Sequence, residues 1–383
     1  MGSLVLEIAG LQSLVDLLRT LGYTVIGPTV RDAAIVNAEI TSLDELPRGW
    51  GDEQDAGRYR LRRRDDGALF GYAGAAQSAK AVFFPATALL WRARRSQDGI
   101  SIERGDESAK SGSPPAYALL GVRACDLRAI AIQDRVLAGR AATDQDYEAR
   151  RRRAFVVAVT CSDPAGTCFC ASMGCGPRPE SGYDLRLTEL IGTDSHRFLV
   201  ESGSALGTAV LAELPGTTAV AQDLADADQV AEWARHRMGR TLETEGLRDA
   251  LHAGANSPVW ESVADRCLSC ANCTLVCPTC FCSSFEDTTD LTGTICERHR
   301  VWDSCHSADF SYLHGGAVRK SAASRYRQWM THKLASWIDQ FGMSGCVGCG
   351  RCITWCPAAI DITAEAAAIR AEQPPLPQQR TEG

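Results

Sequence analysis

Cysteines in this chain form two copies of one pattern, CxxCxxCxxxCP. The copies are Cys267-Cys270-Cys273-Cys277-Pro278 and Cys346-Cys349-Cys352-Cys356-Pro357. In two-cluster ferredoxins, three thiolates at steps of three residues bind one [4Fe-4S] cluster, and the fourth cysteine, before proline, ligates the other cluster. The spacing therefore predicts two neighbouring [4Fe-4S] clusters that carry electrons.

This crossing rule predicts two ligand sets, which are Cys267, Cys270, Cys273 and Cys356 for one cluster, and Cys346, Cys349, Cys352 and Cys277 for the other. Gly345, Gly348 and Gly350 interleave the second set, as expected where backbone approaches inorganic sulfur and offers it N–H groups. A pair of zinc sites is the alternative interpretation. Zinc ligands usually occur as two CxxC pairs separated by a longer loop, and neither copy has that form.

A second group of cysteines follows two short apolar segments, residues 117–122 and 154–160, which are typical of strands buried on both faces. Ligand sites in open α/β sheets favour the carboxyl ends of strands. The cysteines that follow these segments are Cys125, Cys161, Cys168 and Cys170. They could bind a third [4Fe-4S] cluster, but buried reduced thiols or a zinc site are equally open from the residues alone.

The composition fits a redox protein from a reducing compartment. The 17 cysteines are spread through 383 residues, mostly at metal-like spacings, and their odd number argues against complete pairing in disulfides. The start of the chain lacks a basic region and a cleavage site, and no stretch approaches the roughly 18 apolar residues of a membrane span. We therefore expect a soluble cytoplasmic protein. A net charge of -7 and a pI of about 5.6 give no electrostatic footprint for nucleic acid.

The sequence patterns around these cysteines predict an α/β N-terminal domain followed by a mostly α-helical dicluster ferredoxin domain. Apolar residues at helical spacing predict a first helix that ends at Gly22, and strand-like segments follow at 23–26 and 58–62. A second helical stripe, from Tyr326 to Phe341, stops at Gly342. The predicted units are residues 1–255, residues 256–370 and a disordered Pro- and Gln-rich tail at 371–383.

Motifs for other chemistry are missing. No GxGxxG and no GxxxxGK[ST] occurs, so flavin and nicotinamide are expected on another chain. The seven histidines fall in no motif, and no catalytic residue is assigned. Cys280, Cys282 and Cys305 are interpreted as S–H donors that tune a cluster, as ligands of something further, or as buried small apolar groups.

Several stretches together resemble one protein family. They are GVRACDLRAI, CSDPAGTCFCASMGCGP, CPTCFCSS, RVWDSCHSADFSYLHGG, RYRQWMTHKLASWIDQFG and CVGCGRCITWCPAAIDIT. The family is the beta subunit of cytoplasmic NAD(P)-linked [NiFe] hydrogenases, also called sulfhydrogenases. The electron-transfer subunit of anaerobic sulfite reductase is a relative of that family. The resemblance runs from the first predicted helix to about residue 370.

The resemblance implies an electron-transfer role between two partners. One is a flavin- and NAD(P)-binding subunit. The other is the small subunit of a [NiFe] hydrogenase, which serves the large subunit. The resemblance also implies the third [4Fe-4S] cluster on Cys125, Cys161, Cys168 and Cys170. Cys175 and Cys296 do not match the pattern and are expected to be free thiols, with Cys175 as an alternative ligand.

Three other functions remain as hypotheses. The first is the corresponding electron-transfer subunit of an anaerobic sulfite reductase. The second is an iron-sulfur sensor or binding module, although no DNA-binding element is evident. The third is a self-contained enzyme that binds substrate in its N-terminal domain.

Overall fold

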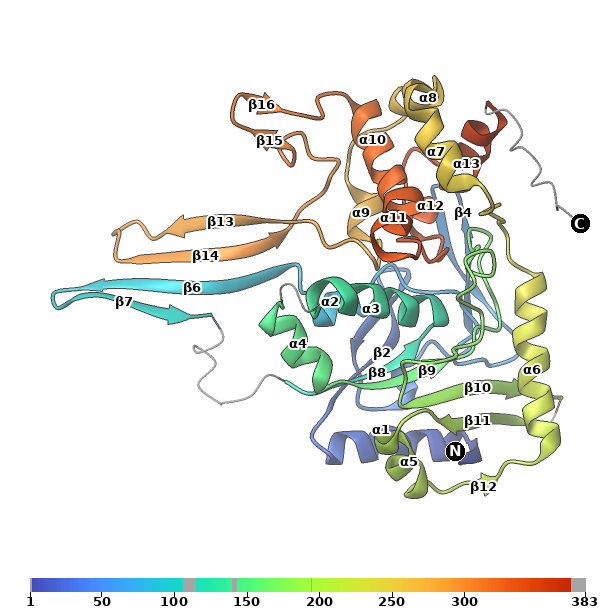
Figure 1. Cartoon of the computed structure of the whole chain (residues 1–383). Helices are drawn as coiled ribbons and strands as arrows, with labels where there is room; N and C mark the ends of the chain where they lie inside the picture. Colours follow the sequence, from blue (N-terminus) through green and yellow to red (C-terminus); the bar gives the residue numbers. More distant parts are fainter. Residues whose placement is uncertain (1, 106–114, 140–142, 194, 373–383) are drawn as a thin grey trace, which may run out of the picture.

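The computed structural model describes residues 2–105, 115–139, 143–193 and 195–372. At its centre is an eight-stranded sheet with the strand order β12-β1-β11-β10-β9-β8-β2-β3 (Figure 1). Strands β2, β8, β9 and β10 run parallel to one another, and the flanking strands are antiparallel. The bounds are β1 (Ser3–Glu7), β2 (Thr24–Arg31), β3 (Ala34–Glu39), β8 (Tyr117–Val122), β9 (Phe155–Val159), β10 (Leu185–Ile191), β11 (His196–Ser202) and β12 (Thr217–Thr218).

Helices cover both faces of this sheet. On one face α1 and α5 pack with inward side chains such as Leu14 and Phe155. On the other face α3 and α4 pack with Leu127 and Val156, and α6 packs through Ala227. The bounds are α1 (Ile8–Thr20), α3 (Ala124–Leu137), α4 (Gln145–Arg152), α5 (Ala205–Ala212) and α6 (Ala221–His236). The predicted α/β arrangement is confirmed for the N-terminal region, where it is built on a mixed sheet.

Most of the helices and strands predicted from local sequence patterns are present in the structure. Helix α1 ends at Thr20 with Leu21 as its C-cap, and Gly22 has the left-handed φ of +87° that a helix terminus favours. The two short apolar segments form β8 and β9, and every residue of β9 is buried. The helix predicted near residue 330 is present as α10 (Ala322–Thr331), a π-helical turn η3 (His332–Ser336) and α11 (Trp337–Phe341), and it ends at Gly342 with a φ of +69°.

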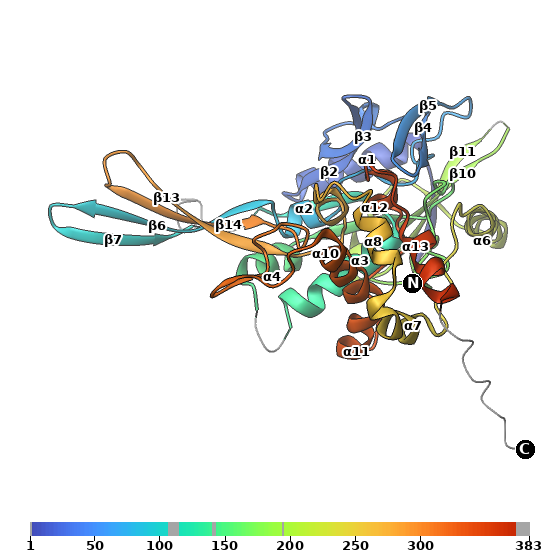
Figure 2. The same cartoon turned by 90° about the horizontal axis from the view of Figure 1, so that it is seen from above.

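A second sheet projects from the body as an arm (Figures 1 and 2). Its order is β13-β14-β6-β7, so it joins two hairpins that are far apart in the sequence. The bounds are β6 (Thr87–Ser96), β7 (Gly99–Arg104), β13 (Ser283–Thr289) and β14 (Ile295–Trp302). A mostly α-helical domain was predicted from residue 256 onward, and the strands β13 and β14 in it were not foreseen. Strand pairing depends on cross-strand neighbours, and here the neighbour of β14 is the distant β6.

The C-terminal region combines short helices with the loops that carry both cysteine signatures. Its helices are α7 (Leu247–Ala253), η2 (Gly254–Asn256), α8 (Val259–Ala264), α9 (Asn272–Leu275), α12 (Arg351–Thr354) and α13 (Ile362–Ala371), beside α10 and α11. The smaller elements of the chain are η1 (Leu43–Glu45), α2 (Lys80–Phe83) and the paired strands β4 (Trp50–Asp55) with β5 (Arg58–Arg63) and β15 (Tyr312–Leu313) with β16 (Gly316–Ala317). With β13 to β16 in it, this region is less helical than predicted.

The C-terminal core also contains Phe169 from the N-terminal region, which packs with residues such as Trp329 and Ile353. The predicted division at residues 255 and 256 stays a prediction. The predicted tail begins at Ala371, the last residue of α13, and its residues 373–383 lie outside the described part of the chain. Within the described ranges, no helix is both long and apolar enough to cross a lipid bilayer.

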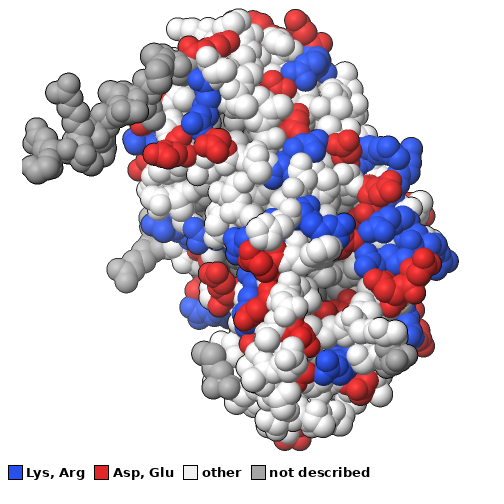
Figure 3. Space-filling model, turned by 90° about the vertical axis from the view of Figure 1, so that its right-hand side faces the viewer, with Lys and Arg blue, Asp and Glu red and all other residues white. Residues whose placement is uncertain are grey.

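Charged side chains of both signs are interspersed on the face shown in Figure 3. Ion pairs of the chain include Arg197 with Asp223 at 2.6 Å and Arg178 with Asp228. Partly exposed pairs contribute about 0–1 kcal/mol each. The buried apolar clusters on the two sheet faces therefore supply most of the stability.

Replacing Leu14 with alanine should lower the free energy of unfolding by about 2–5 kcal/mol, because the side chain is fully buried between α1 and the sheet. Leu21→Ala is the matched control at the end of the same helix, since Leu21 is 53% exposed, and it should change the free energy by less than about 0.5 kcal/mol. Anaerobic urea unfolding followed by circular dichroism measures both. Equal effects at the two positions would contradict the described packing of α1.

Candidate iron-sulfur sites

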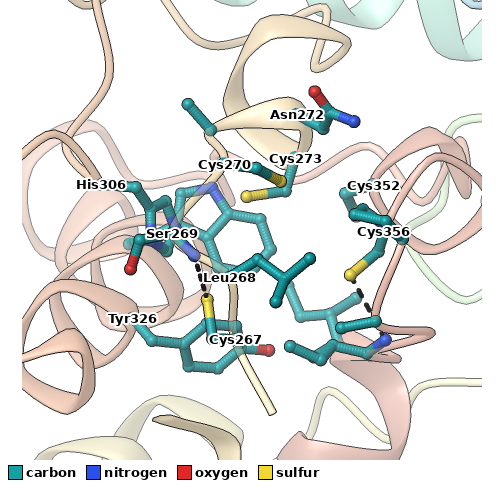
Figure 4. Close-up of a pocket in the computed structure, with 16 residues that line it drawn as sticks. Cys267, Leu268, Ser269, Cys270, Asn272, Cys273, His306, Tyr326, Cys352 and Cys356 are labelled. Atoms are coloured by element: carbon teal, nitrogen blue, oxygen red, sulfur yellow. Dashed lines mark hydrogen bonds between the residues drawn. The ribbon is translucent and has the colours of Figure 1, made fainter.

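The first cysteine signature lies on a loop that leads into α9. Cys267, Cys270 and Cys273 line one pocket (Figure 4). Ser269 and Ala271 have left-handed φ values of 52° and 66°, and these coil the loop tightly. The Ser269 N–H donates to Cys267 Sγ at 3.4 Å. The loop therefore turns thiols and a backbone N–H group toward one centre, which is the environment that an iron-sulfur cluster uses.

The fourth thiol at this pocket comes from the other signature. Cys356 lines the pocket, and its Sγ accepts a hydrogen bond from the Ile360 N–H at 3.4 Å (Figure 4). Tyr326, Trp329 and Leu268 are among the other residues of the wall. The predicted crossing thus brings the first set of four cysteines together around one pocket. Their role as ligands stays a prediction.

The second predicted set is also assembled in space. The Thr279 hydroxyl, two residues beyond Cys277, donates to the Gly345 carbonyl at 2.8 Å, next to Cys346. Burial raises the pKa of Cys352, and Cys346, Cys349 and Cys277 raise it further. The Gly348 N–H donates to Cys346 Sγ at 3.4 Å. Cys277 therefore reaches the second group from the first signature, as the crossing requires.

The glycines of the second signature also permit a contact that the sequence analysis did not foresee. Gly348 and Gly350 have φ values of +66° and +74°. A Cβ at Gly348 would lie 2.6 Å from the backbone of Phe169, and one at Gly350 would lie 2.4 Å from the carbonyl oxygen of Thr167. The Phe169 N–H donates to the Gly348 carbonyl at 2.8 Å. These glycines allow the loop after β9 to lie directly on the second signature.

All four cysteines of the predicted third set line one further pocket. Cys125 lies in the first turn of α3, Cys161 follows β9, and Cys168 and Cys170 lie on the loop beyond. Cys349 of the second set lines the same pocket, and its carbonyl accepts from Cys168 Sγ at 3.9 Å. The third set is therefore adjacent to the second.

Cys175, the alternative ligand of the third set, has a different position. Its Sγ donates to the Val347 carbonyl at 3.0 Å, and it is not among the residues that line the third pocket. Cys296, expected to be a free thiol, lies on β14 in the arm, opposite Thr289. Cys175 therefore lies outside the third pocket and beside the second group, with Cys349 in the same apolar cluster. Cys296 lies on the arm, outside both pockets.

The free thiols of the third set are held in their protonated form. Burial raises the pKa of Cys125, Cys161, Cys168 and Cys170 above the usual range of a thiol. Metal and cluster ligation needs thiolates, so binding must release these protons. Among the described residues, no three Cys, His, Asp or Glu side chains are positioned to hold a single metal ion. The cluster assignment rests on the spacing of the cysteines and on the pockets that they line.

Two buried arginines line the third pocket, and the sequence analysis missed them. Arg123 donates to the carbonyls of Phe70 and Tyr72, each at 2.8 Å. Arg351 pairs with Asp126 at 2.7 Å. A buried charge is costly unless it is paired, so two guanidinium groups here suit a site that gains negative charge. Each arginine lies within two residues of a predicted ligand in the sequence. That spacing could have indicated that both arginines belong to the site.

Lys333 supplies a third buried cation, from the π-helical turn η3. Its Nζ donates to Cys277 Sγ at 3.1 Å and to Thr279 Oγ1 at 2.9 Å. Burial lowers the pKa of Lys333, but the neighbouring Cys277 and Cys280 raise it, and the result lies well above the usual pKa of lysine. The ammonium group therefore stays charged beside a predicted ligand. Short π-helical turns are frequent at functional sites.

Comparison with known proteins found one matching family model and a related curated protein. The 4Fe-4S dicluster domain family matches residues 266–360, which include both signatures. The chain is 32% identical over 270 residues to sulfhydrogenase 2 subunit beta of Pyrococcus furiosus, which covers 70% of this chain and 78% of that protein. No solved structure matches the chain.

Gly350→Ala should reduce the iron content by about four atoms per chain, because the added Cβ would meet the Thr167 carbonyl and push apart the loops of the second and third groups. Gly342→Ala is the matched control. It has nearly the same positive φ but no atom within 4 Å of the added Cβ. Iron analysis of both variants and electron paramagnetic resonance of their reduced forms make the measurement. Equal iron loss in the two variants would show that backbone strain alone is responsible.

Lys333→Met should lower the midpoint potential of the cluster predicted on Cys277 by about 60–130 mV. A hydrogen bond to a charged group contributes about 1.5–3 kcal/mol, and 1.4 kcal/mol corresponds to about 59 mV for one electron. Removing a positive charge disfavours the more negative, reduced state. Lys320→Met is the control, since Lys320 is exposed. Potentiometric titration with spectroscopic detection measures the shift, and an unchanged potential in Lys333→Met would refute the assigned contact.

Proposed function

Because this chain belongs to the family of sulfhydrogenase beta subunits, we propose that it is the iron-sulfur electron-transfer subunit of a hydrogenase complex. In this proposal it relays electrons between an NAD(P)H-linked flavoprotein and the small subunit of a [NiFe] hydrogenase. The flavin and the nicotinamide bind on the flavoprotein, and the hydrogen chemistry takes place in the large subunit. In this proposal the chain itself catalyses no step on hydrogen, flavin or nicotinamide.

The observation that carries the relay is the continuity of the three cysteine groups. Cys352 belongs to the second set and also lines the pocket of the first. Cys349 belongs to the second set and also lines the pocket of the third. The second group therefore lies between the other two, and a series of adjacent centres is what stepwise electron transfer needs.

We propose three [4Fe-4S] clusters, two on the crossing sets and one on Cys125, Cys161, Cys168 and Cys170. When bound, each cluster accepts and gives one electron, which divides the two-electron chemistry of flavin and nicotinamide into single steps. The residues of this chain set the environment for that exchange. Backbone N–H groups donate to Cys267, Cys346 and Cys356, and buried cations offset the negative charge.

A cytoplasmic location is part of the proposal. Free thiols at cluster spacings persist in reducing compartments, whereas oxidising compartments favour disulfides. The expected partners are therefore soluble subunits that meet this chain in the cytoplasm.

Cys349→Ser in the purified complex should abolish electron transfer between the hydrogen and nicotinamide ends, with at least a tenfold loss of hydrogen-dependent NAD(P) reduction. Dye-linked activity at each end should persist, because each partner keeps its own active site. Cys296→Ser is the control, since Cys296 lies on the arm and in none of the three groups. The complex is purified anaerobically and its subunits are identified by mass spectrometry. Full coupling in Cys349→Ser, or a sirohaem protein in place of the hydrogenase subunits, would contradict the proposal.

A further inference from the structure

Three cysteines that belong to none of the cluster sets lie at the base of the arm. Cys280 and Cys282 precede β13, and Cys305 follows β14. All three are partly buried and free. The β13–β14 hairpin therefore leaves and returns to the body between Cys282 and Cys305, and a link between these two residues would close the hairpin at its base.

The backbone holds these two residues together. Ser283 is opposite Trp302 at the last pair of the hairpin, and the Asp303 N–H donates to the Cys282 carbonyl at 2.9 Å. The Asp303 carboxylate then accepts from the Ser304 N–H at 2.6 Å, which fixes the turn that follows. Cys305 lies two residues beyond Asp303, and the interaction between the two thiols lowers the pKa of Cys282 and raises that of Cys305.

We propose that Cys282 and Cys305 form a reversible disulfide by exchange with a low-molecular-weight disulfide. The Cys282 thiolate attacks one sulfur of the small disulfide, forms a mixed disulfide and releases one small thiolate. Cys305 loses its proton and attacks the Cys282 sulfur, which forms the internal S–S bond and releases the second small thiolate. Two cysteine thiols are oxidised and one small disulfide is reduced to two thiols, so atoms and electrons balance.

The environment gives the two sulfurs different roles. The hydrogen bond from Cys305 lowers the pKa of Cys282 to about 7, and the nearby Lys333 ammonium lowers it as well. The same hydrogen bond raises the pKa of Cys305, and burial raises it further. The thiolate is the nucleophile in disulfide exchange. Cys282 is therefore suited to attack first, and Cys305 is suited to resolve the mixed disulfide.

Neighbouring cysteines do not offer the same chemistry. Cys280 is hydrogen-bonded to Cys277, which the second cluster set uses. Cys296 lies at the far end of β14, opposite Thr289. The pairing of Cys282 with Cys305 therefore leaves the predicted cluster ligand Cys277 untouched.

The bond would have two consequences. It would close the loop that contains β13 and β14 and so restrain the base of the arm. It would also replace an ionisable thiol near Lys333, whose ammonium group contacts Cys277, by a neutral disulfide. This second consequence, a redox control of the neighbouring cluster, rests on the proposed function.

The test uses the full chain with its clusters, kept anaerobic and treated with cystamine as the small disulfide. Free thiols are then alkylated with N-ethylmaleimide, and the peptides are identified by mass spectrometry. We expect a cross-linked peptide pair that contains Cys282 and Cys305, at least a tenfold fall in alkylated Cys282, and full reversal by dithiothreitol. In Cys305→Ser, Cys282 should retain a cysteamine adduct, because the resolving thiol is gone. Cys296→Ser should form the bridge like the unmodified chain.

Other outcomes overturn the inference. It fails when both thiols are alkylated equally before and after cystamine while the iron content is unchanged. It also fails when both thiols resist alkylation before any oxidant and Cys282→Ser loses iron, because they would then be ligands of a further cluster. Absence of iron from the untreated chain, or a Cys277–Cys280 disulfide in it, would count against the proposed function. The fate of Cys282 and Cys305 in the same sample would still decide the inference.

Discussion

The direct contact between the loop after β9 and the second cysteine signature is the constraint on which the arrangement of the three cysteine groups depends. Gly348 and Gly350 have no side chains, so the backbone at Thr167 and Phe169 can lie against them at distances that a Cβ would forbid. The Phe169 ring then packs in the C-terminal core. This backbone contact therefore helps to join the sheet of the N-terminal region to the ferredoxin-like loops, and it makes the second and third groups neighbours.

Electrostatics then follows from this close packing. The buried thiols gathered in one region favour the neutral, protonated state until a metal takes the place of the protons, as the raised pKa values of Cys125 and Cys352 indicate. The buried cations that would offset the negative charge of a bound cluster already have hydrogen-bond partners in this structure. Arg123 and Arg351 do not need to move into position, so their orientation costs little when charge arrives.

The sequence predicted those features that depend on short-range spacing. The cysteine sets follow from steps of three residues, helix α1 from its apolar repeat, and β9 from an uninterrupted apolar run. The structure brings each set together, whereas the ligand roles themselves remain predictions. The arm was missed because β14 pairs with β6, a strand from a different part of the chain. Most residues of β14 are partly exposed, and the middle of the strand, residues 297–300, is polar. No local pattern encodes a partner of that kind.

Lys333 is a charged residue on an apolar helical stripe, and such a residue indicates a site elsewhere in the sequence that binds it. The helical stripe from Tyr326 to Phe341 is otherwise apolar or aromatic on its buried side, and a lysine there is unfavourable unless an anion receives it. The chain contains only four lysines, and two of them, Lys80 and Lys333, are buried near Cys277 and Cys280. A charged residue on a core-facing stripe is thus a signal of a partner with negative charge. Here that partner is Cys277, which lies on the first signature and reaches the second group.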